Sequence, residues 1–459
     1  APQLVTDGMA EKEILCKYKR SHSAMNTNPV VPSFALLAGK VDGGGSFCED
    51  PVELAKTIGL TGEVMVWVND ESDSEGEKAS LAQVELILDL MPARVGGPGF
   101  SSNAKVYDWL DKGATKVVVS YSESQLGFLD GVPKDRISIL ITVQGSTEEG
   151  ATLAGGRQLK EAMNEISYYA DSIMMKFQDP AAPLDRTAVE KAKEALSKGM
   201  RLALLDAASN TDDVGWTDSI GVESVLCKKM QDGSLPLEQA LGAALVSDRP
   251  DGLIPTVVVD EDLVSLGLCY SNLQSVREAV VRRVGVYWSR TRGLWIKGLT
   301  SGATQELLRI DLDCDRDAMR FVVRQSGVGF CHMEQMSCFG DDHGTLGALM
   351  RTLIDRKKNA PAGSYTKRLF DDPALLKSKL LEECEELLAA EDTKEVAWET
   401  ADVVYFAFAA CARHEVNLAQ VQRNLARKAL RVRRRPGNAK PAGWKPGDPS
   451  PDKDTAAGS

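Results

Sequence analysis

Three aspartates alternate with other residues between Asp313 and Asp317. Carboxylates so close together repel one another unless a cation neutralises them, and hard divalent cations such as Mg²⁺ favour oxygen ligands of this kind. An EF-hand calcium loop is excluded, because its sixth position is Ala318 instead of glycine and its twelfth is Arg324 instead of glutamate. The pattern predicts a Mg²⁺ site at Asp313, Asp315 and Asp317, with a solvated acidic turn as the alternative.

Three cysteines accompany this acidic run. Cys314 lies inside it, and Cys331 and Cys338 follow on either side of His332. Thiolates suit Zn²⁺, and three protein ligands leave a fourth position for water, whose pKa the metal lowers toward neutrality. The spacing is not that of a zinc finger, so small buried cysteines of a reduced protein are the alternative.

A Gly-rich segment with two arginines, a lysine and several hydroxyl groups precedes the acidic run. Such groups can hold the phosphate and ribose of a nucleotide, and an exposed basic hairpin is the alternative. The candidate substrate-binding residues are Trp288, Ser289, Arg290, Arg292, Lys297, Thr300 and Ser301.

Together these motifs resemble phosphoribosyl-AMP cyclohydrolase, an enzyme of histidine biosynthesis, over about residues 249–340. The matching stretches read WSRTRGLWIKG, TSG, DCDRD and FCHMEQMSCF. The resemblance implies hydrolytic opening of the purine ring of phosphoribosyl-AMP by a homodimer that binds Zn²⁺ and Mg²⁺. Cys314 of one subunit would join Cys331 and Cys338 of the other as zinc ligands. His332 would be the catalytic proton carrier or, alternatively, a hydrogen-bonded structural histidine.

This chain departs from bacterial members of that family at one motif. Those members often read GETSGH, where Leu299 and Ala303 replace the acid and the histidine here. The departure leaves open how protons are transferred or substrate is placed at these positions.

Five carboxylates occupy two helical segments near the C-terminus: Glu382, Glu383, Glu386, Glu399 and Asp402. Spacings of three and four residues put such side chains on shared helix faces, and Mg²⁺ prefers a few carboxylates together with substrate phosphates. A solvated acidic face paired with Lys377 and Lys379 is the alternative, although apolar neighbours such as Leu380 argue against it.

The order EExxE followed by ExxD resembles phosphoribosyl-ATP pyrophosphohydrolase over about residues 364–440. The resemblance implies that the five carboxylates hold Mg²⁺ on the triphosphate of phosphoribosyl-ATP, with Glu383 as the catalytic residue. From charge and position, we expect Lys379, Arg423 and Lys428 to meet phosphates. Phe406 stands where many relatives have histidine. Other nucleotide pyrophosphatases share the acidic motif, and the neighbouring cyclohydrolase motifs select the histidine pathway.

Alternating strand-like and helical stretches over about residues 30–245 predict a parallel sheet with crossover helices. Strands are expected at Phe34–Ala38, Val64–Val68, Lys116–Ser120, Ile137–Val143, Ile173–Phe177 and Arg201–Asp206. Helices are expected at Glu77–Leu90, Asn103–Lys112, Glu149–Tyr168 and Arg186–Lys198. The number of units favours a βα barrel, and an open doubly wound sheet is the alternative.

The pattern divides the chain into an α/β part, a β-rich part and an all-α part. We expect a βα barrel-like domain over residues 1–247, a small, mostly antiparallel domain over 248–345, a helical domain over 346–435 and a flexible tail over 436–459. In the first domain, Asp42–Gly45 and Gly96–Gly99 could cradle phosphate, but turns are the favoured interpretation. We therefore predict that this domain is a non-catalytic scaffold.

Composition sets the class of partner. A net charge of −12 argues against binding to nucleic acid, and no apolar run reaches the length that spans a membrane. Nine scattered cysteines are typical of reduced thiols and predict a cytoplasmic location.

The order of the parts resembles the front of the fungal multifunctional histidine enzyme, in which a histidinol dehydrogenase domain follows. The chain is either a two-activity protein or one whose dehydrogenase lies beyond this sequence. The main hypothesis is a bifunctional hydrolase acting on phosphoribosyl-ATP and then on phosphoribosyl-AMP. The alternatives are a nucleotide pyrophosphatase alone and a non-catalytic zinc-binding scaffold.

Overall fold

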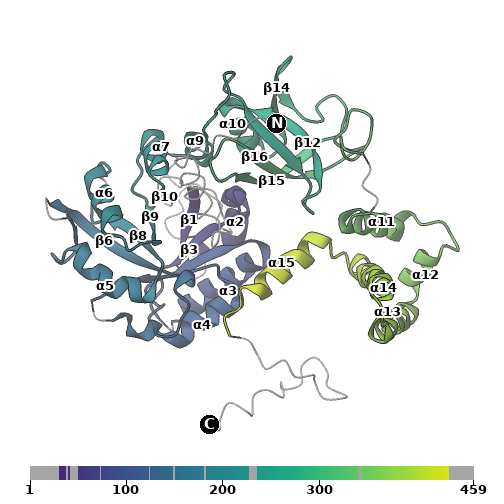
Figure 1. Ribbon diagram of the computed structural model, residues 1–459, viewed down its shortest axis with the longest axis horizontal. Helices are drawn as coiled ribbons and strands as arrows, with labels where there is room; N and C mark the ends of the chain where they lie inside the picture. The colour runs from purple at the N-terminus through teal and green to yellow at the C-terminus, as the bar shows by residue number, and fades with distance from the viewer. Residues whose placement is uncertain are drawn as a thin grey trace, which may run out of the picture.

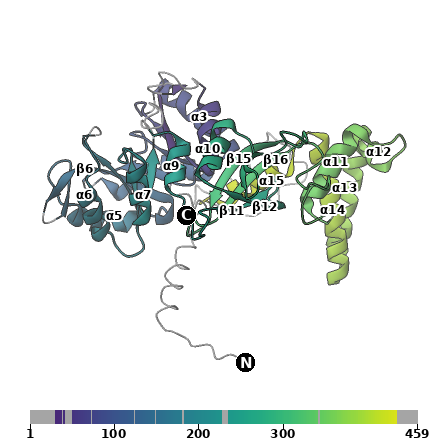
Figure 2. The same cartoon turned by 90° about the horizontal axis from the view of Figure 1, so that it is seen from above.

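The computed structural model describes residues 30–37, 40–41, 50–72, 74–123, 125–147, 150–179, 182–226, 235–340 and 344–433. These residues form a barrel, a small β domain and a helical domain, which follow one another in space (Figures 1 and 2). The segment Asp42–Gly45, predicted as a turn with phosphate binding as the alternative, and the predicted tail at 436–459 lie outside the described residues.

The barrel is built from eight parallel strands, and pairing of the last strand with the first closes it. In order they are β1 (Val30–Leu37), β3 (Val64–Val68), β4 (Ala93–Gly96), β5 (Val117–Ser120), β6 (Ile137–Thr147), β8 (Ser172–Phe177), β9 (Arg201–Leu205) and β10 (Glu223–Leu226). Two short strands, β2 (Lys40–Val41) and β7 (Gly150–Leu153), add antiparallel pairs to β1 and β6. The prediction of a barrel is confirmed, and the open sheet is excluded.

Alternate residues of each strand serve different cores, because successive side chains point to opposite faces. In β3, Met65 joins the barrel interior, whereas Val64 and Val66 pack outward against the helices. The interior cluster consists of Val31, Met65, Val118, Leu140, Met174, Ala203 and Val225. The centre of the barrel is therefore a packed core and not a channel.

The barrel helices are α2 (Pro51–Ile58), α3 (Glu75–Leu90), α4 (Asn103–Lys112), α5 (Leu159–Tyr169), α6 (Arg186–Ala195), α7 (Thr211–Ser219) and α9 (Leu237–Ala243), and η1 (Gly59–Thr61) is a 3₁₀ turn. The expected helix at Glu149–Tyr168 was wrong over residues 150–158, which form β7 and a turn. Gly155 and Gly156 have φ values of 104° and 89°, a left-handed backbone that a helix does not contain.

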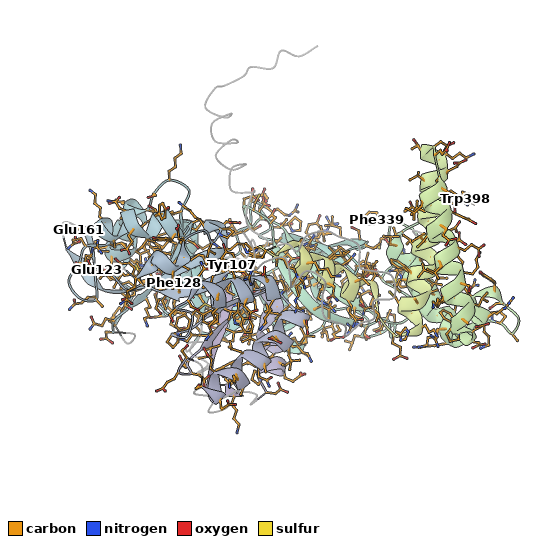
Figure 3. The ribbon with its side chains drawn as sticks, turned by 90° about the horizontal axis from the view of Figure 1, so that it is seen from below. Tyr107, Glu123, Phe128, Glu161, Phe339 and Trp398 are labelled. Carbon is orange, nitrogen blue, oxygen red and sulfur yellow. The ribbon has the colours of Figure 1, made fainter. Side chains whose placement is uncertain are left out.

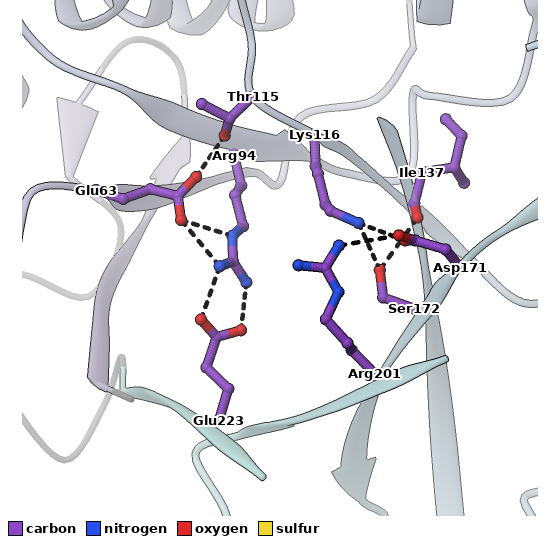
Figure 4. A network of polar contacts seen from close by, with 9 residues as sticks. All are labelled: Glu63, Arg94, Thr115, Lys116, Ile137, Asp171, Ser172, Arg201 and Glu223. Carbon is purple, nitrogen blue, oxygen red and sulfur yellow. Dashed lines mark hydrogen bonds and ion pairs between the residues drawn. The ribbon is translucent and has the colours of Figure 1, made fainter. Parts of the chain in front are cut away.

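A network of buried charges lies where several barrel strands begin (Figure 4). Arg94 pairs with Glu63 at 2.9 Å and with Glu223 at 2.6 Å. Beside them Lys116 pairs with Asp171 at 2.6 Å, and burial is the main reason why the pKa of Lys116 falls to about 8. Buried charges are tolerated when they are paired, so this network seals one mouth of the barrel.

The glycines of Gly96–Gly99 are explained by close packing. A Cβ on Gly96 would lie 2.7 Å from the Trp67 ring, and one on Gly97 would lie 2.3 Å from the Val68 carbonyl oxygen. These contacts support the turn interpretation of the segment over the phosphate-binding one.

The β domain holds one four-stranded sheet in the order β12 (Ser265–Ser271), β11 (Ile254–Val259), β16 (Met319–Gln325) and β15 (Gln305–Leu312). The central pair β11 and β16 is parallel, and the other two pairs are antiparallel. A separate hairpin joins β13 (Val286–Ser289) to β14 (Gly293–Ile296), and α10 spans Leu273–Arg282. The prediction of a mixed, mostly antiparallel domain is confirmed.

The helical domain consists of α11 (Leu346–Asn359), α12 (Tyr365–Asp371), α13 (Pro373–Ala389), α14 (Thr393–Arg413) and α15 (Leu418–Ala429). Its core is a separate cluster that includes Met350, Leu369 and Phe406. In the described part of the chain, none of the helices combines the length and apolar character needed to cross a membrane.

The end of α15 returns to the barrel (Figure 1). Arg427 pairs with Asp89 and donates to the Lys112 carbonyl at 2.6 Å. Arg433 pairs with Asp111 at 2.7 Å. The helical domain is therefore tied to the first domain as well as to its neighbour in the sequence.

Asp262, in the turn between β11 and β12, is a partly buried carboxylate beside two other acidic residues. Burial raises the pKa of Asp262 to about 6, and Asp260 and Glu261 add repulsion. Because the folded pKa lies above the unfolded value of 3.8, the folded state loses stability as pH rises from about 4 to about 6. We expect Asp262→Asn to raise the free energy of unfolding at pH 7 by about 1 kcal/mol, a figure reduced for partial solvation.

Urea-induced unfolding at pH 7 and pH 4 checks this prediction, because the gain should vanish at the lower pH. Glu261→Gln is the control, since the Glu261 carboxylate pairs with Arg324 at 3.3 Å and its neutralisation should bring no gain. Equal stability of Asp262→Asn and the unchanged chain at pH 7 would contradict the prediction.

Candidate active sites

The acidic loop, residues 313–318, joins β15 to β16. Ligand atoms of Asp313, Asp315 and Asp317 all lie within 4.8 Å of one another. The Asp313 carboxylate also accepts from the Ala318 amide at 3.2 Å, which fixes the turn. Burial raises the pKa of Asp313, and repulsion from Asp315 and Asp317 adds to the rise. Three carboxylates whose oxygens converge in this way fit a divalent cation.

Cys331 and Cys338 lie together in a tight loop after β16. The Cys331 amide donates to the Gln335 carbonyl at 3.0 Å, and the Cys338 amide donates to the Leu266 carbonyl at 2.8 Å. Burial raises the pKa of the Cys338 thiol, with a further contribution from Cys331. Two neighbouring thiols fit part of a zinc site, because Zn²⁺ takes up thiolates.

Cys314 does not join this pair within one chain. The loop that carries it connects the two strands at one edge of the sheet, β15 and β16, whereas Cys338 is bonded to β12 at the opposite edge. Two to three strand spacings of about 4.8 Å separate these positions, but two sulfurs bound to one zinc ion must lie within about 4 Å.

Lys297 links the basic hairpin to the cysteine pair. Its side chain is buried, lies 5.4 Å from the centre of the Phe330 ring, and the whole residue is 7% exposed. Burial lowers the pKa of Lys297, and Cys269, Cys338 and Cys331 partly offset the effect. Lys297 is thus a predicted substrate-binding residue that interacts electrostatically with the thiols.

The other predicted residues of the hairpin are closer to solvent. Arg290 stacks over Tyr270 at 4.9 Å, and Arg292 lies 5.5 Å from the centre of the Trp295 ring. The Ser289 hydroxyl accepts from the Arg292 amide at 3.2 Å and shapes the turn. Trp288 is half-buried, and Thr300 and Ser301 are exposed. The exposed arginines and hydroxyls are available to an anionic ligand.

His332 is exposed, and its Nδ1 lies 4.0 Å from the Cys331 sulfur. Ala303, where bacterial members have histidine, is buried, and a Cβ at Gly327 would lie only 3.4 Å from the Ala303 Cβ. The departure at Ala303 is thus accommodated by packing. Sequence reasoning missed Cys269, whose thiol pKa burial raises to about 12, with Cys338 adding to it; a single cysteine in a strand gives no signal.

The carboxylate cluster of the helical domain lies between α13 and α14. Ligand atoms of Glu383, Glu386 and Glu399 fall within 4.8 Å of one another. Burial raises the pKa of Glu399, and Glu386, Asp402 and Glu383 add repulsion. The Glu399 Oε2 is shielded from solvent and has no hydrogen-bond partner among the described residues. Repulsion among these carboxylates, together with the unpartnered oxygen of Glu399, fits a site for a cation such as Mg²⁺.

Lys379 lies at the rim of this cluster. It pairs with Glu382 at 2.8 Å and with Glu383 at 2.9 Å, and these bonds raise the pKa of Lys379. Arg423 was expected to meet phosphates here, but α15 carries it toward the β domain, where burial and then Arg324 lower the pKa of Arg423. A helix whose end is fixed on the barrel does not cover the α13–α14 cluster.

Two family profiles match separate parts of the chain. Phosphoribosyl-AMP cyclohydrolase matches residues 267–340, and phosphoribosyl-ATP pyrophosphohydrolase matches residues 346–429. The acidic loop and the cysteine pair fall in the first, and the carboxylate cluster falls in the second.

Three curated relatives match parts of this chain. The histidine biosynthesis trifunctional protein of Komagataella pastoris is 56% identical over 206 residues, which cover 45% of this chain and 24% of that protein. The trifunctional protein of Neurospora crassa is 40% identical over 339 residues, covering 72% of this chain and 36% of that protein. The bifunctional protein HisIE of Synechocystis sp. is 35% identical over 211 residues, covering 43% of this chain and 98% of that protein.

The chain spans less than half the length of these trifunctional relatives. It covers the bifunctional relative almost completely. Both hydrolase profiles also match it, one after the other. The chain therefore belongs to the family of histidine biosynthesis proteins that join a phosphoribosyl-AMP cyclohydrolase domain to a phosphoribosyl-ATP pyrophosphohydrolase domain.

Proposed function

We propose that this chain is a bifunctional hydrolase that performs two successive steps of histidine biosynthesis. The helical domain would convert phosphoribosyl-ATP into phosphoribosyl-AMP and pyrophosphate, and the β domain would then open the adenine ring of phosphoribosyl-AMP. The observation that carries the proposal is that each matched domain contains its own cluster of metal-type ligands. One cluster alone would support only one of the two reactions.

For pyrophosphate release, Glu382, Glu383, Glu386, Glu399 and Asp402 would hold Mg²⁺, which neutralises charge on the triphosphate. Glu383, with a side chain only 9% exposed, would accept the proton of the attacking water. Lys379, which pairs with Glu382 and Glu383 at the rim, would turn to a phosphate oxygen once a cation takes its place.

For ring opening, Cys331 and Cys338 with the partner subunit's Cys314 would hold Zn²⁺, which activates water at neutral pH. The acidic loop would hold Mg²⁺ through its three aspartates. Lys297 would stabilise the Cys338 thiolate by its positive charge. The exposed ring of His332, beside Cys331, would carry the proton to the departing ring nitrogen.

The attachment of Cys314 and Cys338 at different strands of the sheet supports a homodimer that shares the zinc site. Exposed apolar side chains near the cysteine loop support it, because Phe339, Met333 and Leu299 are 75%, 68% and 76% exposed. Trp398, 68% exposed, lies on the projecting helical hairpin (Figure 3). Neighbouring exposed apolar side chains, such as those near the cysteine loop, can mark a surface that a second subunit covers. The thiols would need a reducing, cytoplasm-like compartment.

Subunit mixing tests the shared zinc site. Cys314→Ser and Cys331→Ser homodimers should each be inactive in ring opening. In a mixed dimer one of the two sites recovers all three cysteines, so statistical mixing should restore about a quarter of the unmixed wild-type activity. Spectrophotometry of the aminoimidazole product follows the recovery. No recovery after proven subunit exchange would mean that the site is not shared.

Incubation with phosphoribosyl-ATP, Mg²⁺ and Zn²⁺ tests the whole proposal. Pyrophosphate together with the ring-opened product supports it. Accumulation of phosphoribosyl-AMP would instead indicate a pyrophosphatase alone, and absence of turnover would indicate a zinc-binding scaffold.

A further inference from the structure

The side chain of Arg316, in the acidic loop, extends from the β domain to the barrel. Arg316 has a φ of 70°, a left-handed backbone that is unusual for a residue other than glycine. Its guanidinium pairs with Asp218 on barrel helix α7, and the two side chains are 17% and 6% exposed. Among the described residues Arg316 forms no ion pair with Asp315 or Asp317, its neighbours in the sequence. The arginine is therefore drawn away from the carboxylates beside it.

The backbone of the loop is held from the same side. The Val246 amide, in the segment between the barrel and the β domain, donates to the Arg316 carbonyl at 3.2 Å. The strand that leads into the loop also lies against the barrel at η1. A Cβ on Gly62, whose φ is 87°, would lie 3.0 Å from Cδ of Arg309 on that strand. The pair with Asp218, the bond from Val246 and the packing of β15 on η1 together hold the acidic loop beside the barrel.

The charges explain what this attachment does. A guanidinium within reach of three converging carboxylates is a competitor for any cation that they bind. Its burial against Asp218 satisfies the arginine elsewhere and leaves the carboxylates of Asp313, Asp315 and Asp317 to the metal. Truncation of one partner of a buried ion pair leaves the other charge uncompensated, so loss of Asp218 would send Arg316 back toward the loop.

We propose that Asp218 is a positioning residue for the cyclohydrolase reaction, and that the barrel shapes the acidic loop for its divalent cation. This rests on the proposed function only in that the loop binds such a cation. The barrel then has a role without a catalytic site of its own. It holds Arg316 out of the ligand cluster and fixes the turn that presents Cys314.

Asp218→Asn in the full-length chain tests the proposal, with Mn²⁺ as a spectroscopic probe of the loop. We expect the affinity of the loop for Mn²⁺, and the Mg²⁺ dependence of ring opening, to weaken by about tenfold or more. Ring opening at saturating Mg²⁺ should stay near the wild-type rate, and pyrophosphate release should not change. Asp212→Asn is the matched control, because Asp212 lies on the same helix and its pair with Arg186 is exposed.

The double variant Asp218→Asn with Arg316→Gln separates charge competition from loss of structure. Removal of the competing guanidinium should recover most of the Mn²⁺ affinity, and failure to recover it would overturn the proposal. Unchanged Mn²⁺ affinity in Asp218→Asn would also overturn it. The loop site itself is identified with Asp315→Asn, which should remove one bound Mn²⁺. If Asp315→Asn removed none, the metal loop of the proposed function would fail first, and this proposal with it.

Discussion

Replacement of Cys331 by serine is expected to abolish ring opening and to leave pyrophosphate release at its wild-type rate. Cys331 is buried in a loop that its own amide fixes through the Gln335 carbonyl, so a serine of the same shape preserves the loop. The hydroxyl is a much poorer zinc ligand than a thiolate. Because metal activation contributes several kcal/mol to such a reaction, the loss should be at least about a thousandfold.

Two measurements check this prediction together. Phosphoribosyl-AMP turnover reports the reaction, and zinc content per subunit reports the ligand directly. Cys411→Ser is the control, because Cys411 is a free cysteine of the helical domain, and it should alter neither quantity. If Cys331→Ser kept its full zinc content and full ring-opening activity, Cys331 would not be a zinc ligand.

Replacement of Glu383 by glutamine is expected to have the converse effect. Its side chain is 9% exposed, lies within 4.8 Å of ligand atoms of Glu386 and Glu399, and pairs with Lys379. The amide keeps the shape but removes one negative charge from the proposed Mg²⁺ site. Pyrophosphate release should fall by about a thousandfold or more, whereas phosphoribosyl-AMP supplied directly should be opened at the wild-type rate.

The same helix offers a matched control. Glu385 is exposed on α13 and lies outside the cluster, so Glu385→Gln should keep both activities. Coupled phosphate detection after pyrophosphatase treatment measures the first reaction. If Glu383→Gln lost both activities while it remained folded, the two reactions would not have independent sites.

The sequence predicted those features that depend on neighbours along the chain. The helix expected at Asn103–Lys112 and the strand expected at Val64–Val68 are both observed with the same bounds. Hydrophobic periodicity is a local signal and survives folding. For the same reason Asp313, Asp315 and Asp317 were predicted as one cluster, since a single loop carries them.

Features that depend on distant contacts gave no such signal. Strands β4 (Ala93–Gly96) and β10 (Glu223–Leu226) have four residues each, too few to show a period, although β10 closes the barrel. Nothing near Asp218 in the sequence distinguishes it from other acidic residues. Its pairing with Arg316 exists only in the folded chain. The docking of α15 and the residues after it was not predictable either. It depends on Asp89 and Asp111 of the barrel surface and not on the periodicity of the helix.

The return of α15 to the barrel has a consequence for biosynthesis of the chain. Domains generally fold as units while the ribosome is still at work, with the N-terminal one first. The surfaces that receive Arg316 and Arg427 both belong to the barrel, so they are complete before either hydrolase domain has been translated. Each later domain can then dock onto the folded barrel as it emerges from the ribosome. The barrel thereby guides the assembly of the two domains that follow it.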